Sequence, residues 1–97
     1  MLTSKERKAL SSIGQTLNPV FQIGKNGVTD ELLKELSDVL DARELIKITV
    51  LRGCDETAKE IINELCASLG ADPVSCIGNK MVIYRKSDRR DIKHIEF

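Results

Sequence analysis

Aromatic residues are scarce in this sequence, which has 97 residues with 3% aromatics and no tryptophan. The aromatic residues are Phe21, Tyr84 and Phe97, and Phe21 stands in a short apolar run that is typical of a buried strand. Nucleic-acid-binding modules that stack several bases on a platform of aromatic rings need more of these side chains. That mode of recognition is therefore excluded.

Metal-binding and nucleophilic side chains are few as well. His94 is the single histidine, and Cys54, Cys66 and Cys76 show no C-x-x-C spacing. Zinc sites and Cys–His catalytic pairs require close combinations of these residues, so we expect no metal and no cofactor. The odd number of cysteines is typical of reduced thiols in the cytoplasm, with Cys66 on the apolar face of a helix.

Long apolar runs are missing too. No stretch of about 18 apolar residues, the length that crosses a bilayer, occurs in the chain. No apolar segment follows the charged N-terminus as in a secretory signal, so we expect a monomeric, cytoplasmic protein without a membrane partner. The length suits one domain over residues 1–97, with an ordered core at about 2–86 and a charged C-terminal tail that frays.

Acidic and basic residues are equal in number, and the net charge is zero. Their distribution is uneven: residues 1–28 carry +3, residues 29–44 carry −4, residues 45–73 carry −2 and residues 74–97 carry +3. If the two basic ends meet in the fold, one surface becomes positive while the molecule stays neutral. Solvated surfaces without a partner would give the same pattern, and the sequence leaves both interpretations open.

Hydrophobic spacing predicts seven elements in the order α-β-α-β-α-β-β. The first helix covers residues 4–16 and begins with a capping box at Thr3. Thr29 caps the second helix, and the third extends from a cap at Asp55 to a stop at Gly70.

The predicted strands cover residues 20–23, 45–51, 74–77 and 80–85. Each strand–helix–strand connection is expected to be a right-handed crossover that makes its two strands parallel neighbours, and a type II′ turn at Gly78 and Asn79 joins the last two strands. These rules predict a mixed four-stranded sheet. In the second strand Lys47 and Thr49 alternate with apolar residues, so we expect one sheet face to be partly uncovered in a two-layer α/β sandwich.

The segment most indicative of function is residues 24–27 (GKNG), which joins a strand to a helix. Two glycines let the main chain turn sharply, so that freed N–H groups and the start of the next helix point at an anion. Strand, Gly-x-x-Gly loop and helix is the arrangement by which KH domains hold a nucleic-acid backbone. The alternative is a tight turn that needs glycine only for its dihedral angles, and Asp30 and Glu31 would weaken the positive field.

Several stretches together resemble the CRM domain, the RNA-binding module of chloroplast splicing and ribosome-maturation factors, and most closely its bacterial stand-alone YhbY-type form. They are residues 2–7 (LTSKER), 17–29 (LNPVFQIGKNGVT), 44–48 (ELIKI) and 77–85 (IGNKMVIYR). The resemblance spans residues 2–86 in one register. The chain departs from the family at Ala42 and Arg43, where a histidine more often precedes Glu44.

The resemblance implies a two-layer α/β fold similar to the C-terminal domain of bacterial translation initiation factor three, with the last strand inside the sheet and antiparallel to the others. It also implies RNA binding, association with precursors of the large ribosomal subunit, and no enzymatic activity or small-molecule substrate. The family's Gly-x-x-Gly loop matches residues 24–27, and its basic N-terminal helix matches Lys5, Arg7 and Lys8.

The candidate RNA-binding residues are Lys5, Arg7, Lys8, Gly24, Lys25, Asn26, Gly27, Lys47, Lys80 and Arg85. For the cations outside the loop, a solvated surface position is an equal alternative, and for tail cations such as Lys93 it is the preferred interpretation. Two other functions stay open. One is a protein-binding adaptor on ribosome-assembly particles that uses the acidic residues Glu31, Glu35 and Asp38. The other is a small nucleotide-dependent enzyme, which is disfavoured because G-x-x-x-x-G-K-[ST] is absent.

Overall fold

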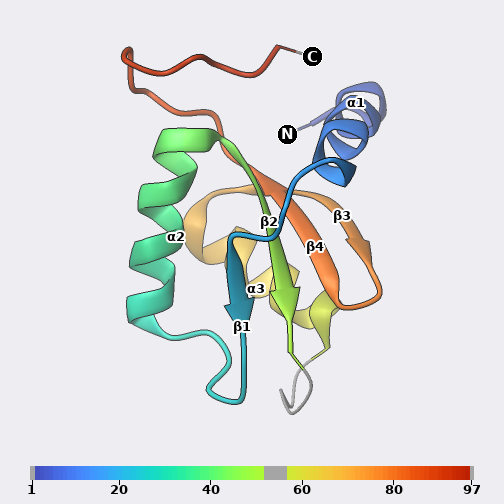
Figure 1. Cartoon of the computed structure of the whole chain (residues 1–97), viewed down its shortest axis with the longest axis vertical. Coiled ribbons are helices and arrows are strands. Elements are labelled where there is room, and N and C mark those ends of the chain that lie inside the picture. The colour runs from blue at the N-terminus through green and yellow to red at the C-terminus, as the bar shows by residue number, and fades with distance from the viewer. Residues whose placement is uncertain (1, 52–56, 97) are drawn as a thin grey trace.

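The computed structural model describes residues 2–51 and 57–96, which form a four-stranded sheet and three helices (Figure 1). The elements are α1 (Ser4–Gln15), β1 (Phe21–Ile23), α2 (Asp30–Arg43), β2 (Leu45–Val50), α3 (Ala58–Leu69), β3 (Asp72–Ile77) and β4 (Lys80–Tyr84). Their order confirms the predicted α-β-α-β-α-β-β arrangement. Within these ranges, no helix combines the length and the apolar character that crossing a bilayer requires.

The strands lie in the order β1-β2-β4-β3. β1 pairs with β2 in parallel, whereas β4 is antiparallel to both of its neighbours, β2 and β3. The last strand thus occupies an inner position, as the resemblance implied, and the predicted mixed sheet is confirmed. Because β4 lies between β2 and β3, the expectation that the crossover through α3 joins neighbouring strands was wrong. Gly78 in the β3–β4 turn has a φ of 60°, the positive value that the first central residue of a type II′ turn requires.

Helices cover the two faces of the sheet unequally. On one face, Ile48 of β2 lies in a buried cluster with Leu40 of α2 and Leu65 of α3. On the other face, Leu45 of β2 packs in a smaller buried cluster with Leu10 of α1. Because side chains alternate along a strand, β2 contributes to both clusters, and the sheet with α2 and α3 forms the main two-layer sandwich.

α1 reaches only part of its face of the sheet. Its cluster contains Leu45 at the start of β2 and Tyr84 at the end of β4, so the helix lies at that end of the sheet. Gly14 in its last turn is so near β4 that a Cβ there would lie 2.9 Å from Cγ1 of Val82. Side chains toward the β3–β4 turn, such as the exposed Lys80, are left uncovered on this face.

Side-chain caps fix the helix starts. Thr3 and Thr29 cap α1 and α2 as predicted, and Gly70 ends α3 in the left-handed conformation. At the start of α3 the prediction was wrong, because the cap is Thr57, whose hydroxyl accepts a hydrogen bond from the third helical N–H. Asp55, the predicted cap, lies outside the described residues.

The sequence predicts a frayed tail after β4, and the structure differs. Ser87 is 3% exposed, and its N–H donates to the Glu44 carboxylate at 2.7 Å. The N–H of Ile95 donates to the same carboxylate at 2.8 Å, and Nδ1 of His94 lies 2.9 Å from it. A buried carboxylate at the end of α2 therefore anchors the C-terminal segment by contacts that the polar composition of the tail does not reveal.

Candidate nucleic-acid interface

Residues 24–27 form a tight turn between β1 and α2, hereafter the 24–27 turn. The N–H of Gly27 donates to the carbonyl of Gly24 at 3.0 Å, which leaves Lys25 and Asn26 exposed at the corner. In the part of the chain that the structure describes, the N–H groups of Lys25 and Asn26 have no intramolecular acceptor. Two backbone donors and one ammonium group are thus available to an anion at this corner.

The two glycines of this turn differ in what they contribute. Gly27 has a φ of 63°, a conformation in which a side chain is strained. Gly24 has no such φ, and a Cβ there would meet Cδ1 of Leu51 at 3.8 Å, an ordinary contact. The turn therefore requires glycine at position 27, whereas the backbone of this chain does not require it at position 24.

The start of α2 follows two residues after the turn. The hydroxyl of Thr29 accepts the N–H of Leu32 at 3.1 Å. Asp30 and Glu31 are exposed in the first turn of the helix, as the sequence indicates. Their negative charges partly cancel the positive end of the helix dipole, so the helix start adds little attraction for a phosphate. Other cations must supply it.

Lys47 and Lys80 lie on the same face of the sheet, the face that α1 partly covers; Lys80 is exposed, whereas Lys47 is half-buried beside the end of α1. In the pairing register Lys47 is opposite Val82, and Thr49 is opposite Lys80, so alternation directs both ammonium groups to one side. Gln22 of β1 is in turn opposite Thr49, which extends this row to the strand that leads into the 24–27 turn. The row thus places Lys80 toward the end of the sheet that carries the turn, and Lys47 on the same face but level with the start of β1.

Two large apolar side chains are exposed on the same surface. Among the described residues, Leu51 is 40% exposed and Ile77 is 67% exposed. Leu51 is two residues after Thr49, and Ile77 is opposite Lys80, so both share the face of the two lysines. We call the set of Gln22, Lys47, Thr49, Leu51, Ile77 and Lys80 the open sheet face.

Sequence reasoning assigned no role to the uncharged members of the open sheet face. Alternation within β1 indicates that Gln22 faces away from the main core, because Phe21 and Ile23 flank it. Which strand lies beside β1 depends on the long-range register, and no local pattern contains that information.

The basic residues of α1 are not brought to the 24–27 turn. Lys5, Arg7 and Lys8 are all exposed. In Figure 1, α1 lies at the top of the view and the turn before α2 lies at the bottom, along the longest dimension of 36 Å. Arg7 lines a shallow groove beside the edge strand β3 together with Lys59 of α3. These cations can meet only a ligand long enough to reach both ends of the sheet.

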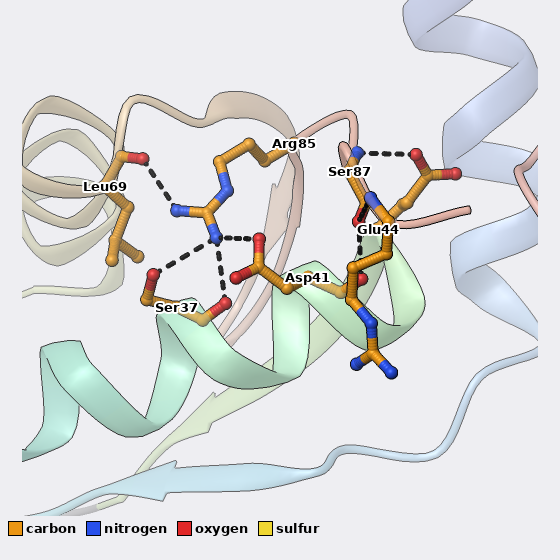
Figure 2. A network of polar contacts seen from close by, with 7 residues as sticks. Ser37, Asp41, Glu44, Leu69, Arg85 and Ser87 are labelled. Carbon is orange, nitrogen blue, oxygen red and sulfur yellow. Dashed lines mark hydrogen bonds and ion pairs between the residues drawn. The ribbon is translucent and has the colours of Figure 1, made fainter. Parts of the chain in front are cut away.

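Arg85 is occupied inside the protein (Figure 2). Its guanidinium donates to the carbonyls of Leu69 at 3.1 Å and Ser37 at 2.8 Å, and to the hydroxyl of Ser37 at 3.1 Å. It also pairs with Asp41 at 2.9 Å, and its side chain is 20% exposed. Because these contacts connect α2 to the end of α3, we remove Arg85 from the proposed interface.

The chemistry of the remaining groups is that of anion binding. Among the described residues, no group of three His, Cys, Asp or Glu side chains could hold a metal ion. Cys66 is buried in α3 as predicted, and burial raises the pKa of its thiol to about 11, which keeps it protonated at neutral pH. Cys76 is exposed, and Cys54 lies outside the described residues. What converges on one side of the molecule is a set of N–H and ammonium donors.

Comparison with known proteins gives consistent matches. Residues 2–85 match the CRS1 / YhbY (CRM) domain. The chain is 40% identical over 96 residues to a protein of Bacillus subtilis (strain 168) named "Probable RNA-binding protein YqeI", covering 99% of this chain and 98% of that protein. It is 36% identical over 92 residues to a Haemophilus influenzae protein named "RNA-binding protein", covering 95% and 93% of the two chains.

The fold is also found in a solved structure. The solution structure of SAV1595 from Staphylococcus aureus, a hypothetical protein described as a candidate RNA-binding protein, superposes with a TM-score of 0.79 at 36% identity. The match covers 98% of this chain and 100% of the other. These matches confirm the resemblance that the sequence motifs indicated.

Proposed function

Because this chain belongs to the CRS1 / YhbY (CRM) domain family, we propose that it binds RNA through the 24–27 turn and the open sheet face. We further propose that the RNA is ribosomal RNA of large-subunit precursors and that the protein acts, as a cytoplasmic monomer, in assembly of that subunit. The names of the relatives indicate RNA binding and not catalysis, which agrees with the donor groups of this surface.

A single observation carries the proposal. The exposed corner of the 24–27 turn lies beside a sheet face that Lys47 and Lys80 share with the exposed apolar side chains of Leu51 and Ile77. Backbone N–H and ammonium groups bind phosphate oxygens, and the aliphatic chains of Leu51 and Ile77 offer contact to unstacked bases. Such a surface suits a flexible, single-stranded or looped RNA segment.

Recognition through these groups depends mainly on phosphates and RNA shape. Aromatic stacking on bases should be sparse, because Phe21 is half-buried and Tyr84 is buried, and Phe97 lies outside the described residues. With roughly three to five phosphate contacts, the logarithm of the association constant should fall with the logarithm of salt concentration with a slope of about −2 to −4.5. Sequence preference should accordingly be weak.

The experiment that tests the proposal reverses one charge at the turn. Lys25→Glu should weaken binding to a large-subunit ribosomal RNA fragment by at least about tenfold, since it removes one phosphate contact and adds repulsion. Lys34→Glu is the matched control, because Lys34 is exposed on α2 outside the proposed surface. Filter binding across a salt series gives both the affinity and the slope.

The adaptor function predicts a different result. Glu31, Glu35 and Asp38 are exposed on α2, and a protein partner that bound them would hold the Lys25→Glu variant on ribosome-assembly particles as well as the wild type. Sedimentation of the wild type and of the Lys25→Glu variant with such particles distinguishes the two functions. Crosslinking to RNA in cells then identifies the RNA segment.

A further inference from the structure

A second, larger groove lies on the α1 side of the sheet. Its volume is about 570 Å³, within the usual range for small-ligand sites. The connection from α1 to β1, the end of α2, the start of β2 and the C-terminal segment form its walls. Its apolar lining is provided by Ile13, Leu17, Val20, Leu45, Ile46 and Ile95.

Three cations line this groove without a carboxylate among the lining residues. They are Arg43 of α2, Lys47 of β2 and Lys93 of the C-terminal segment. None of them takes part in an ion pair among the described residues. The groove is therefore locally positive in a chain whose net charge is zero.

Three neighbouring carboxylates are paired elsewhere, whereas the exposed Glu96 makes no ion pair among the described residues. Asp41 binds Arg85, Asp91 binds Arg89 and the Glu44 carboxylate contacts His94. Arginines thus neutralise Asp41 and Asp91, and hydrogen bonds within the fold occupy both oxygens of Glu44, so the three cations of the groove are left to attract an anion.

The wall that carries Lys93 is held in place. Glu44 anchors the C-terminal segment on both sides of that lysine, at Ser87 and at His94 and Ile95. Ile95 also packs against the buried cluster under α1. Lys93 is therefore positioned by a buried carboxylate and an apolar contact, although it belongs to a polar segment.

We propose that this groove binds one unstacked nucleotide of the bound RNA strand. Arg43 and Lys93 hold the phosphates at the rim, and the base lies against the apolar walls. Lys47 lines this groove and also belongs to the open sheet face, so one strand can pass from one to the other. The inference rests on the proposed RNA binding and adds a binding site to it. An acidic peptide is the alternative occupant, and the test includes it.

The first experiment removes charge. Arg43→Ala with Lys93→Ala should weaken binding to single-stranded hexauridylate about tenfold and make the log–log salt slope shallower by about 1.4. The control is Arg90→Ala with Lys86→Ala, because these residues are the same types, are exposed, lie in the C-terminal segment and do not line the groove. The control pair should leave the affinity within about twofold.

The second experiment fills the groove without changing charge. Ala42 lines the groove at the end of α2, so Ala42→Trp should occupy the space of the base and lower hexauridylate affinity by about three- to tenfold. Ala67→Trp on the exposed side of α3 is the matched control and should bind as the wild type does. Thermal unfolding of all variants shows that each is folded.

The outcomes separate the two proposals. If the wild type fails to bind any RNA, the proposed function is wrong and the groove assignment falls with it. If the wild type binds but the groove and control variants behave alike, only the groove assignment is overturned. Binding of hexaglutamate that is as tight as hexauridylate and lost with the same substitutions would also overturn it, because the site would then accept any polyanion. UMP and inorganic phosphate, each added separately, should compete weakly with hexauridylate for the groove, and UMP should be the better competitor.

Discussion

The two ends of β4 carry basic residues in opposite environments. Lys80 is exposed on the open sheet face and makes no ion pair among the described residues. Arg85, directly after the strand, makes four hydrogen bonds to groups of α2 and α3. An odd separation of five positions places the two side chains on opposite faces of the sheet. Charge alone therefore does not separate an exposed cation from one bonded within the protein, whereas strand parity does.

The comparison predicts that stability and RNA affinity separate between the two positions. Arg85→Ala should lower the free energy of unfolding by about 2–4 kcal/mol, because it leaves Asp41 and two carbonyls without their charged donor. Lys47→Ala with Lys80→Ala should instead lower RNA affinity about tenfold and change the unfolding free energy by less than about 0.5 kcal/mol.

Urea denaturation and RNA titration of the same preparations measure both effects. Arg90→Ala is the control for the arginine, since it is exposed and makes none of these contacts. This separation of stability from RNA affinity would be contradicted if a folded Arg85→Ala protein lost RNA affinity as strongly as the double lysine variant does.

The two glycines of the 24–27 turn should also differ in whether they affect stability or RNA affinity. Gly27→Ala should destabilise the fold by about 1 kcal/mol, because its φ of 63° is unfavourable for alanine. Gly24→Ala should leave stability unchanged, because the new Cβ makes only an ordinary contact with Leu51.

The RNA affinity of the Gly24→Ala variant then tests whether glycine is needed at position 24 for binding. If the RNA backbone approaches this residue closely, Gly24→Ala lowers affinity several-fold in a fully stable protein. Unchanged affinity would mean that the close contact lies elsewhere on the turn. Chemical denaturation and filter binding of both variants provide the data.

The smallest expected effect concerns pH and the anchored tail. Burial by itself would raise the pKa of Glu44, but hydrogen bonds from His94, Ser87 and Ile95 outweigh it and hold that pKa below 4.5. The hydrogen bond to Glu44 in turn raises the pKa of His94 above 6.5. The contribution of His94 to the free energy of unfolding is therefore complete below pH 6.5 and is lost as pH rises through its raised pKa. That of Glu44 is complete above pH 4.5 and is lost as pH falls through its lowered pKa.

The stability difference between the wild type and His94→Asn should accordingly be largest between pH 4.5 and 6.5 and decline above that range. Thermal unfolding across pH measures it, and Arg90→Ala provides a control from the same segment, because Arg90 is exposed and is not among the groups that shift the pKa of His94. A difference that grows with rising pH would contradict the assignment of the ion pair.

Much of the fold was predictable because its signals are local. Apolar spacing, the Thr3 and Thr29 caps and the Gly78 turn act within a few residues, and each appears in the structure as expected. The Thr57 cap was missed since several polar residues precede α3 and any of them could serve.

The candidate site was only partly predictable. The 24–27 turn and the alternation of β2 indicated Lys25 and Lys47. The distance of α1 from the turn, the internal contacts of Arg85 and the anchoring of Lys93 all depend on which strands and helices become neighbours. Such long-range placement is set by register and packing, and single residues carry no local sign of it.

The inner position of β4 has a consequence for how the chain acquires its structure. β2 and β3 share no pairing in this sheet, so residues 80–84 are the bridge through which the two halves of the sheet become one. A chain that ends before Lys80 leaves β2 with an unpaired edge, which invites association with other chains. Residues 80–84 must therefore be synthesised before the sheet can close, and until then this edge of β2 stays unshielded.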